Sequence, residues 1–342
     1  MQLVTKGDRD TGMSEFRWKS FICVILAGIL MLDGCAGKDS AGITTGRLPT
    51  SAEESVTQTT SVAANIFIET AVASMDQVSE DGLRYEYRSK NLVMSVYCDE
   101  WDKLDKSKSG YQNATEFLQE AAEYFNEIAR LTGKSEEYSE YKNINISFLF
   151  VDSTVSTTNR LPSSDGMYMA DICLSIEYFE HGVAPIAHEI THTLFPLGIS
   201  KSLGEGLPSY MQDIVSGKPA QPNYGIDADK LCALWLFSEE DKETVTEIFE
   251  STGDINNAIF KNIDKRTRAY NFASSFTHYM INNYGMENYL NIYSSMDPYS
   301  LYQEVTGQTL EELHEDWRNH LEQYKGKITA DEIDEIVSNL FE

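Results

Sequence analysis

The clearest hydrophobic period in the chain lies between Asn113 and Thr132 and is helical. Apolar side chains recur there at spacings of three and four residues, at Phe117, Ala121, Tyr124, Phe125, Ile128 and Leu131. This spacing places them on one face of a helix. Gly133 follows directly, and glycine is common just past the end of a helix. The pattern therefore predicts an amphipathic helix over 113–132.

The period changes to two between Gly166 and Tyr178. Alternate positions are all apolar or aromatic, while those between them are mixed; the apolar set is Tyr168, Ala170, Ile172, Leu174, Ile176 and Tyr178. Because side chains alternate between the two faces of a strand, this segment predicts a strand with one buried face. Two further apolar segments, 83–98 and 145–151, also predict strands. The first is expected to be a hairpin that turns near Lys90 and Asn91.

Helical patterns dominate the remainder of the chain. A first helix is expected over 62–78, and from Ala184 onward helices are expected over 184–195, 206–215, 227–237, 242–250, 266–283, 286–294, 309–324 and 329–340. Strands early and helices late are typical of an α+β fold. We expect an N-terminal lobe (62–196) with a mixed β-sheet and helices, followed by a mostly α-helical C-terminal lobe (197–342). A cleft between two such lobes is a usual place for a site.

The first 35 residues are expected to be an export signal and not part of the fold. Their apolar run, 21–32, is shorter than the roughly 20 residues that span a bilayer. It ends in Leu-Asp-Gly-Cys35, which resembles the lipobox of bacterial lipoproteins, although Asp33 replaces the usual small uncharged residue. The resemblance implies that Cys35 carries a lipid; the alternative is an ordinary cleaved signal with a chance cysteine. A compact basic start after Met13 makes Met13, as well as Met1, a candidate for the true first residue.

Residues 36–61 are expected to be a disordered tether. Serine, threonine, glycine and alanine dominate the segment, which leaves too little apolar surface to fold. As a random coil of about 25 residues it would reach roughly 25–30 Å. We therefore expect an exported protein that a lipid anchor at Cys35 holds on the outer face of a bacterial cell membrane.

The charge of the chain excludes several classes of partner. It has 27 basic and 54 acidic residues, a formal net charge of −27 at pH 7. Such a chain repels polyanions, so no nucleic acid and no bare anionic lipid is expected as a direct partner. About 280 residues follow the N-terminal segments, enough for a large core in one domain or two.

Residues 188–192, His-Glu-Ile-Thr-His, carry the strongest chemical signal. On a helix, positions i and i+4 lie one above the other, so His188 and His192 can present two imidazole nitrogens to one metal ion. Glu189 lies about 100° around the helix axis and can reach a water on that metal. A chance match in a chain of this length has a probability of roughly 1 %. The apolar neighbours also weigh against the alternative, which is two unrelated histidines on a surface helix.

A catalytic zinc ion needs a third protein ligand and an open position. No third histidine follows closely, but Glu205 comes thirteen residues after His192. We expect it in a loop before a helix that begins at about Leu207 and Pro208, and such a loop could bring its carboxylate back to the metal. The sequence thus predicts one Zn²⁺ per chain, bound by His188, His192 and Glu205.

The combination of HExxH, a short loop and E-G-x-x-x-Y resembles the gluzincins, zinc metallopeptidases of the thermolysin-like clan. It is most similar to the peptidase MA-like group, which it matches at Leu203, Glu205, Gly206 and Tyr210 and from which it departs at Ser202 and Pro208. Pro208 fits only if it lies in the first turn of a helix. Two weaker matches lie over 270–285 and 305–317, so the resemblance covers roughly residues 90–325.

The resemblance implies a zinc-dependent metallopeptidase that hydrolyses peptide bonds through a metal-activated water. Glu189 would act as the general base, and Tyr270 would stabilise the oxyanion, with His278 and Tyr279 as rivals. In this family the strand corresponding to 166–178 is an edge that binds a peptide or protein substrate as an added strand. The alternative for that segment is a fully paired internal strand.

Two other functions remain open at this point. A catalytically inactive metallopeptidase-like lipoprotein could act as a cell-surface binding or scaffold protein. A solute-binding lipoprotein would instead show repeated strand–helix alternation in both halves, which the helical second half disfavours.

Overall fold

The structure is a computed structural model that describes residues 77–161, 165–196, 200–238 and 263–342. The described residues belong to one compact unit. The export signal, Cys35, the tether and the expected helix over 242–250 lie outside them, as does the expected helix over 62–78 except for its last two residues.

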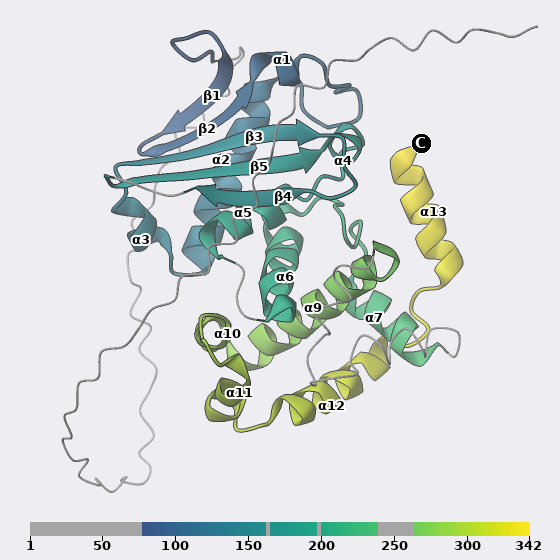
Figure 1. The fold of residues 1–342 in the computed structure, drawn as a ribbon. Helices are drawn as coiled ribbons and strands as arrows, with labels where there is room; N and C mark the ends of the chain where they lie inside the picture. Colours follow the sequence, from purple (N-terminus) through teal and green to yellow (C-terminus); the bar gives the residue numbers. More distant parts are fainter. Residues whose placement is uncertain (1–76, 162–164, 197–199, 239–262) are drawn as a thin grey trace, which may run out of the picture. The chain divides into compact units, whose positions relative to one another are not determined.

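One five-stranded mixed sheet and many helices make up the fold, so the predicted mixed sheet is confirmed (Figure 1). The strands are β1 (Arg84–Ser89), β2 (Leu92–Tyr97), β3 (Asn143–Val151), β4 (Thr157–Leu161) and β5 (Met167–Ser175), in the order β1-β2-β3-β5-β4. β2, β3 and β5 run parallel, while β1 and β4 are antiparallel to their neighbours. β1 and β2 form the expected hairpin, and Lys90 at its turn has a φ of 51°.

One face of the sheet is buried. The inward side chains of the three parallel strands lie in register, with Leu92, Met94 and Val96 beside Ile144, Ile146 and Phe148, which in turn lie beside Tyr168, Ala170 and Ile172. Helix α2 (Ala114–Leu131) packs on this face, where its Phe117 ring lies 4.8 Å from that of Phe148. Asn113 caps α2 by accepting a hydrogen bond from the Glu116 N–H, which confirms the helix predicted over 113–132.

Helix α5 (Ile186–Leu194) also packs on this face, next to α2. The hydroxyls of Tyr138 and Tyr168 both donate to the Thr193 carbonyl near its C-terminal end. Three short helices complete this half of the chain: α1 (Cys98–Trp101), α3 (Ser135–Ser139) and α4 (Ile176–Glu180). The apolar side of the sheet thereby fixes the position of the HExxH helix.

The second half of the described chain is helical, as predicted. It comprises α6 (Lys201–Met211), the π-helical turn η1 (Gln212–Ser216), α7 (Ala228–Phe237), α9 (Ile263–Tyr284), α10 (Met286–Tyr293), α11 (Pro298–Thr306), α12 (Leu310–Leu321), the 3₁₀ turn η3 (Glu322–Tyr324) and α13 (Ala330–Phe341). In Figure 1, α6 lies between the β4 side of the sheet and α9, and it packs against α9. The α9 rings Phe272 and Phe276 pack on Trp317 of α12. None of the described helices combines the length and the apolar character needed to cross a membrane.

Two expectations about strands and helices were wrong. The strand expected over 166–178 ends at Ser175, whose hydroxyl caps α4, and β5 is internal because β3 and β4 pair with its two sides. The edge strand on this side is β4, whose polar sequence Thr-Thr-Asn-Arg-Leu gave no strand signal. The helix expected from residue 206 begins five residues earlier, because the Ser200 hydroxyl accepts a hydrogen bond from the Leu203 N–H and caps it.

Candidate metal centre

Helix α5 presents both histidines of the HExxH motif to the same point. The rings of His188 and His192 lie 4.9 Å apart, and their Nε2 atoms are separated by 3.2 Å. The helix has no side-chain cap at its own N-terminus. Instead, the Gln212 side-chain oxygen accepts a hydrogen bond from the His188 N–H at 3.1 Å. A side chain from η1 thus satisfies a donor in the first turn, where helices leave four N–H groups without partners.

Helix α6 supplies the third side chain, Glu205. This residue was expected in a loop, but it lies in the middle of the helix because α6 begins at Lys201. Pro208 therefore lies well inside the helix and not in its first turn. A proline there removes the hydrogen bond that residue 208 would donate to the carbonyl four residues earlier, and the remainder of α6 continues through it. Glu205, Ser209 and Gln212 occupy positions i, i+4 and i+7, so one face of α6 and the turn after it meets α5.

The three side chains form a compact donor set that could bind a metal ion. Their ligand atoms all lie within 4.8 Å of one another, and His188 and Glu205 are about 5 % exposed. Glu205 Oε2 is 3.5 Å from His188 Nε2 and 3.3 Å from His192 Nε2. Atoms that share one ion at tetrahedral angles, with bonds of about 2.0–2.1 Å, lie about 3.3–3.4 Å apart. With the 3.2 Å between the two nitrogens, the triangle has the dimensions of a single metal site.

The Glu205 carboxylate and the His192 imidazole strongly influence each other's pKa. Burial by itself would lower the pKa of His192, but the adjacent Glu205 carboxylate outweighs it and raises that pKa above the ordinary value. Burial would likewise raise the pKa of Glu205, but the two histidines hold it well below its usual range. Lys201, one turn earlier on α6, donates to Glu205 Oε1 at 2.9 Å. This leaves Oε2 directed at the histidine nitrogens.

The outer ring nitrogens of the two histidines differ. His188 Nδ1 lies 3.4 Å from the Ser209 hydroxyl, an outer contact of the kind that fixes the orientation of metal-binding imidazoles. His192 Nδ1 is buried and has no hydrogen-bond partner among the described residues. The outer nitrogen of His188 is therefore held by a contact from α6, whereas that of His192 has no such contact among the described residues.

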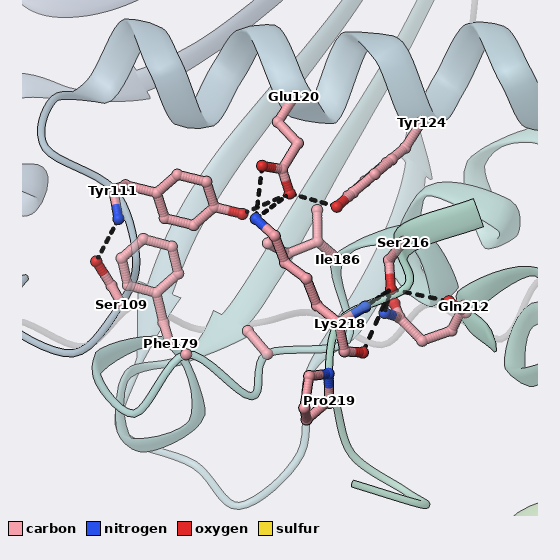
Figure 2. A pocket seen from close by; sticks show the side chains of 12 residues that line it. Ser109, Tyr111, Glu120, Tyr124, Phe179, Ile186, Gln212, Ser216, Lys218 and Pro219 are labelled. Atoms are coloured by element: carbon pink, nitrogen blue, oxygen red, sulfur yellow. Dashed lines mark hydrogen bonds and ion pairs between the residues drawn. The ribbon is translucent and has the colours of Figure 1, made fainter. Parts of the chain in front are cut away.

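The segment that follows η1 is held to the sheet-packing helix α2 by a partly exposed ion pair (Figure 2). Lys218, just after η1, donates to both oxygens of Glu120 on α2 at 2.7 and 2.6 Å. The hydroxyls of Tyr111 and Tyr124 donate to the same carboxylate, and burial followed by this negative charge raises the pKa of both tyrosines. The cavity beside them holds only about 20 Å³. The cluster thus holds the segment after η1, the turn that carries Gln212, against α2.

A large cavity opens in front of the donor set. Its volume is about 720 Å³, and it is lined by residues of β4 and the preceding loop, α5, α6 and α9. Glu189 lines it beside the histidines, and the hydroxyl of Thr158 on β4 lies 2.8 Å from the Glu189 side chain. Tyr270 of α9 lines it too, with its ring 6.0 Å from that of His188. Burial, and then the charges of Glu205 and Glu189, raise the pKa of Tyr270, so its hydroxyl keeps its proton.

The structure brings together most of the predicted site residues but not the two rivals of Tyr270. His278 lies 3.5 Å from Asp213 in a different cavity, and the Tyr279 ring packs beside Phe276. Sequence reasoning missed Thr158, Lys201 and Gln212. Ser200, read as a helix cap, would have predicted a helix that starts at Lys201 and places Lys201 and Glu205 one turn apart on the same face. The polar segment around Thr158 offered no comparable signal.

Comparison with known proteins adds no assignment. No protein-family model matches the chain, and no curated protein matches it. What the chain does must therefore be argued from the site itself.

Proposed function

We propose that this chain is a zinc-dependent metallopeptidase of the gluzincin type, exported and held on the outer face of a bacterial cell membrane by a lipid on Cys35. The observation that carries the proposal is the donor triangle of two histidine nitrogens and one carboxylate oxygen, with edges of 3.2–3.5 Å. Two histidines and one glutamate with an open side are the ligands of a catalytic zinc ion. The cavity of about 720 Å³ lies at that open side.

Zinc bound there would supply a Lewis acid that activates water at neutral pH. The neighbouring Glu189 is suited to take a proton, because its carboxylate lines the same cavity as the donor set. Thr158 lies within hydrogen-bond distance of both the side chain and the backbone carbonyl of Glu189, at 2.8 and 2.9 Å. This contact would hold the carboxylate in one orientation while it receives a proton from water and passes it to the leaving amine.

Tyr270 is suited to stabilise the negative charge that develops on the carbonyl oxygen of a substrate. It lines the same cavity from α9, with its ring 6.0 Å from that of His188 in the donor set. A tyrosine with an ordinary pKa of about 10 is already protonated at neutral pH, and the raised pKa of Tyr270 acts in the same direction, so its hydroxyl can donate a hydrogen bond. The proposed base and the proposed donor thus come from two different helices, α5 and α9, that line the same cavity.

A peptide substrate would be bound as an extended strand along β4. This strand forms the sheet edge beside the donor set, and Thr157, Thr158, Asn159 and Arg160 all line the cavity. An edge strand offers backbone N–H and C=O groups to an added strand, which favours affinity through the main chain and preference through side-chain pockets. The resemblance assigned substrate binding to β5 as an edge strand; we assign it instead to β4, the neighbour that forms the edge.

Metal content is the first test. Purified wild-type protein and the Glu205→Ala variant would be supplied with zinc, dialysed and measured by elemental analysis. We expect about one zinc ion per chain in the wild type and a loss or marked weakening of binding in the variant. A wild-type protein that retains no zinc under these conditions would refute the proposal.

Peptide-bond hydrolysis is the second test. A peptide library incubated with the zinc-loaded wild type and with Glu189→Gln would be read by mass spectrometry. We expect cleavage only in the wild type, because the glutamine keeps the size of the side chain but cannot accept the proton. Zinc binding without any cleavage would favour the inactive binding or scaffold protein instead.

A further inference from the structure

The wall of the site cavity has the opposite charge balance from the chain as a whole. Acidic residues outnumber basic ones two to one in the sequence, 54 against 27. Among the described residues that line the cavity, three are basic, namely Arg160, Lys201 and Arg266, and two are acidic, namely Glu189 and Glu205. Both acidic groups belong to the proposed machinery, and Lys201 already binds one of them.

The two arginines approach the cavity from different elements. Arg160 lies on β4 two residues after Thr158, hence on the same face of the strand, and its guanidinium lies 5.3 Å from the Tyr168 ring centre. Arg266 lies one turn before Tyr270 on α9, and its charge acts on that hydroxyl. Each arginine is therefore a neighbour of a residue proposed to act on the substrate.

This arrangement places two cations in the wall of the cavity that a substrate would enter, one on β4 and one on α9. At physiological salt, exposed charges more than about 8 Å apart are largely screened, so the distant acidic surface has little effect inside the cavity. A guanidinium within contact distance of a carboxylate can instead form two parallel hydrogen bonds. The local charge would thus decide which peptides bind.

We infer that this site selects substrates that carry a carboxylate close to the scissile bond, and that Arg160 and Arg266 recognise it. The inference rests on the proposed peptidase function and names its substrate class. The carboxylate belongs either to an aspartate or glutamate side chain or to the free C-terminus of a short peptide. These two sources share one chemistry, and the peptides chosen for the test separate them.

The experiment compares matched peptides that differ only in charge. Each peptide would carry Asp or Glu, or the isosteric Asn or Gln, on either side of a cleavable bond, and each would be made with a free and with an amidated C-terminus. Cleavage by the zinc-loaded wild type gives kcat/KM, and binding to zinc-loaded Glu189→Gln gives Kd without turnover. We expect the carboxylate forms to be favoured about 10- to 100-fold, the range of a charge-assisted hydrogen bond.

Four variants decide whether the arginines carry the preference. Arg160→Gln, Arg266→Gln and the double variant should reduce the ratio of acid-peptide to amide-peptide kcat/KM stepwise to near one, and Arg→Lys at both positions should retain part of the preference. Arg130→Gln, an exposed arginine on α2 that pairs with Glu127, serves as the matched control and should retain all of it. Zinc stoichiometry on every variant checks that the site is intact.

Each outcome bears on the inference in one direction. Equal use of acid and amide peptides, or a preference that survives in the double variant, overturns it. Arginine-dependent binding of acidic peptides to Glu189→Gln, with no cleavage by the wild type, supports the recognition and refutes the peptidase. A preference limited to free C-termini identifies the terminal carboxylate as the group recognised, and one limited to side chains identifies acidic residues.

Discussion

Replacing Gly206 by alanine would place a methyl group where α6 and α9 are closest. A Cβ atom there would lie 2.7 Å from the Ala273 carbonyl oxygen and 3.2 Å from its carbon, and it would also overlap the Thr277 hydroxyl. Carbon–oxygen contacts of about 3.3 Å are the close limit in proteins, so α6 would have to move by roughly 0.6 Å. The backbone carbonyl cannot rotate away, and Glu205 is the preceding residue. We therefore expect the substitution to displace Glu205, the third residue of the proposed metal site.

The expected cost follows from overpacking. Methylene groups forced into a packed interface destabilise proteins by about 1–3 kcal/mol, which for a folded part of about 280 residues lowers Tm by roughly 2–5 °C. Zinc affinity should fall by about 10- to 100-fold, the range seen when the support of a metal ligand is disturbed. Urea denaturation of the metal-free protein and zinc titration against a competing chelator measure the two effects separately.

The companion variant Thr277→Ala separates the effect of the Thr277 hydroxyl from that of the Ala273 carbonyl. Thr277 also contacts the Tyr289 hydroxyl at 3.0 Å, so its own cost must be measured alone. In the double variant with Gly206→Ala, only part of the stability and zinc affinity should return, because the Ala273 carbonyl remains in place. A single Gly206→Ala variant that unfolds and binds zinc like the wild type would refute the reasoning. Full recovery in the double variant would assign the effect to the hydroxyl instead.

Three further predictions concern the site and the helices behind it. Thr158→Val should lower kcat about 10- to 100-fold with little change in KM, because Glu189 loses a hydrogen bond to its charged form; Thr158→Ser should restore kcat in steady-state assays, and an unchanged valine variant would contradict this. Tyr270→Phe should lower kcat by about 10²- to 10³-fold, the usual cost of one oxyanion donor, and equal activity would exclude the tyrosine. Burial, followed by the charge of Arg318, lowers the pKa of His314 from 6.5 to about 3, so the unfolded chain binds its proton first and stability is lost as pH falls from about 6.5 towards 3. Between pH 8 and pH 5 this should cost about 2 kcal/mol, and urea denaturation should show that His314→Leu lacks this part of the slope.

The two histidines of the candidate metal site were predictable because the rule that joins them is local. Positions i and i+4 face the same way on any helix, and the apolar neighbours on α5 supplied the packing face. Glu205 was predictable as a ligand only through its place after the motif. Its position within α6 was not, since the glycines and proline around it suggested a loop, and the cap at Ser200 outweighed them.

The residues that escaped prediction depend on contacts between distant segments. Thr158 acts through the edge strand β4, whose sequence Thr-Thr-Asn-Arg-Leu has no hydrophobic alternation. Gln212 satisfies a donor on a helix 24 residues earlier. Lys218 is held by Glu120 from a segment 98 residues away. Propensity and period describe neighbours along the chain and carry no information on such pairs.

The exposed edge of β4 also bears on how copies of the chain behave together. Among the described residues, β4 ends the sheet, and an unpaired strand is a template on which a second copy can add its own strand. β4 is only five residues long and carries Arg160, both of which limit such pairing. The charge of −27 adds mutual repulsion at neutral pH. As acid neutralises the carboxylates this repulsion fades. The colloidal stability of a molecule with this exposed sheet edge therefore depends on the negative charge of the rest of its surface.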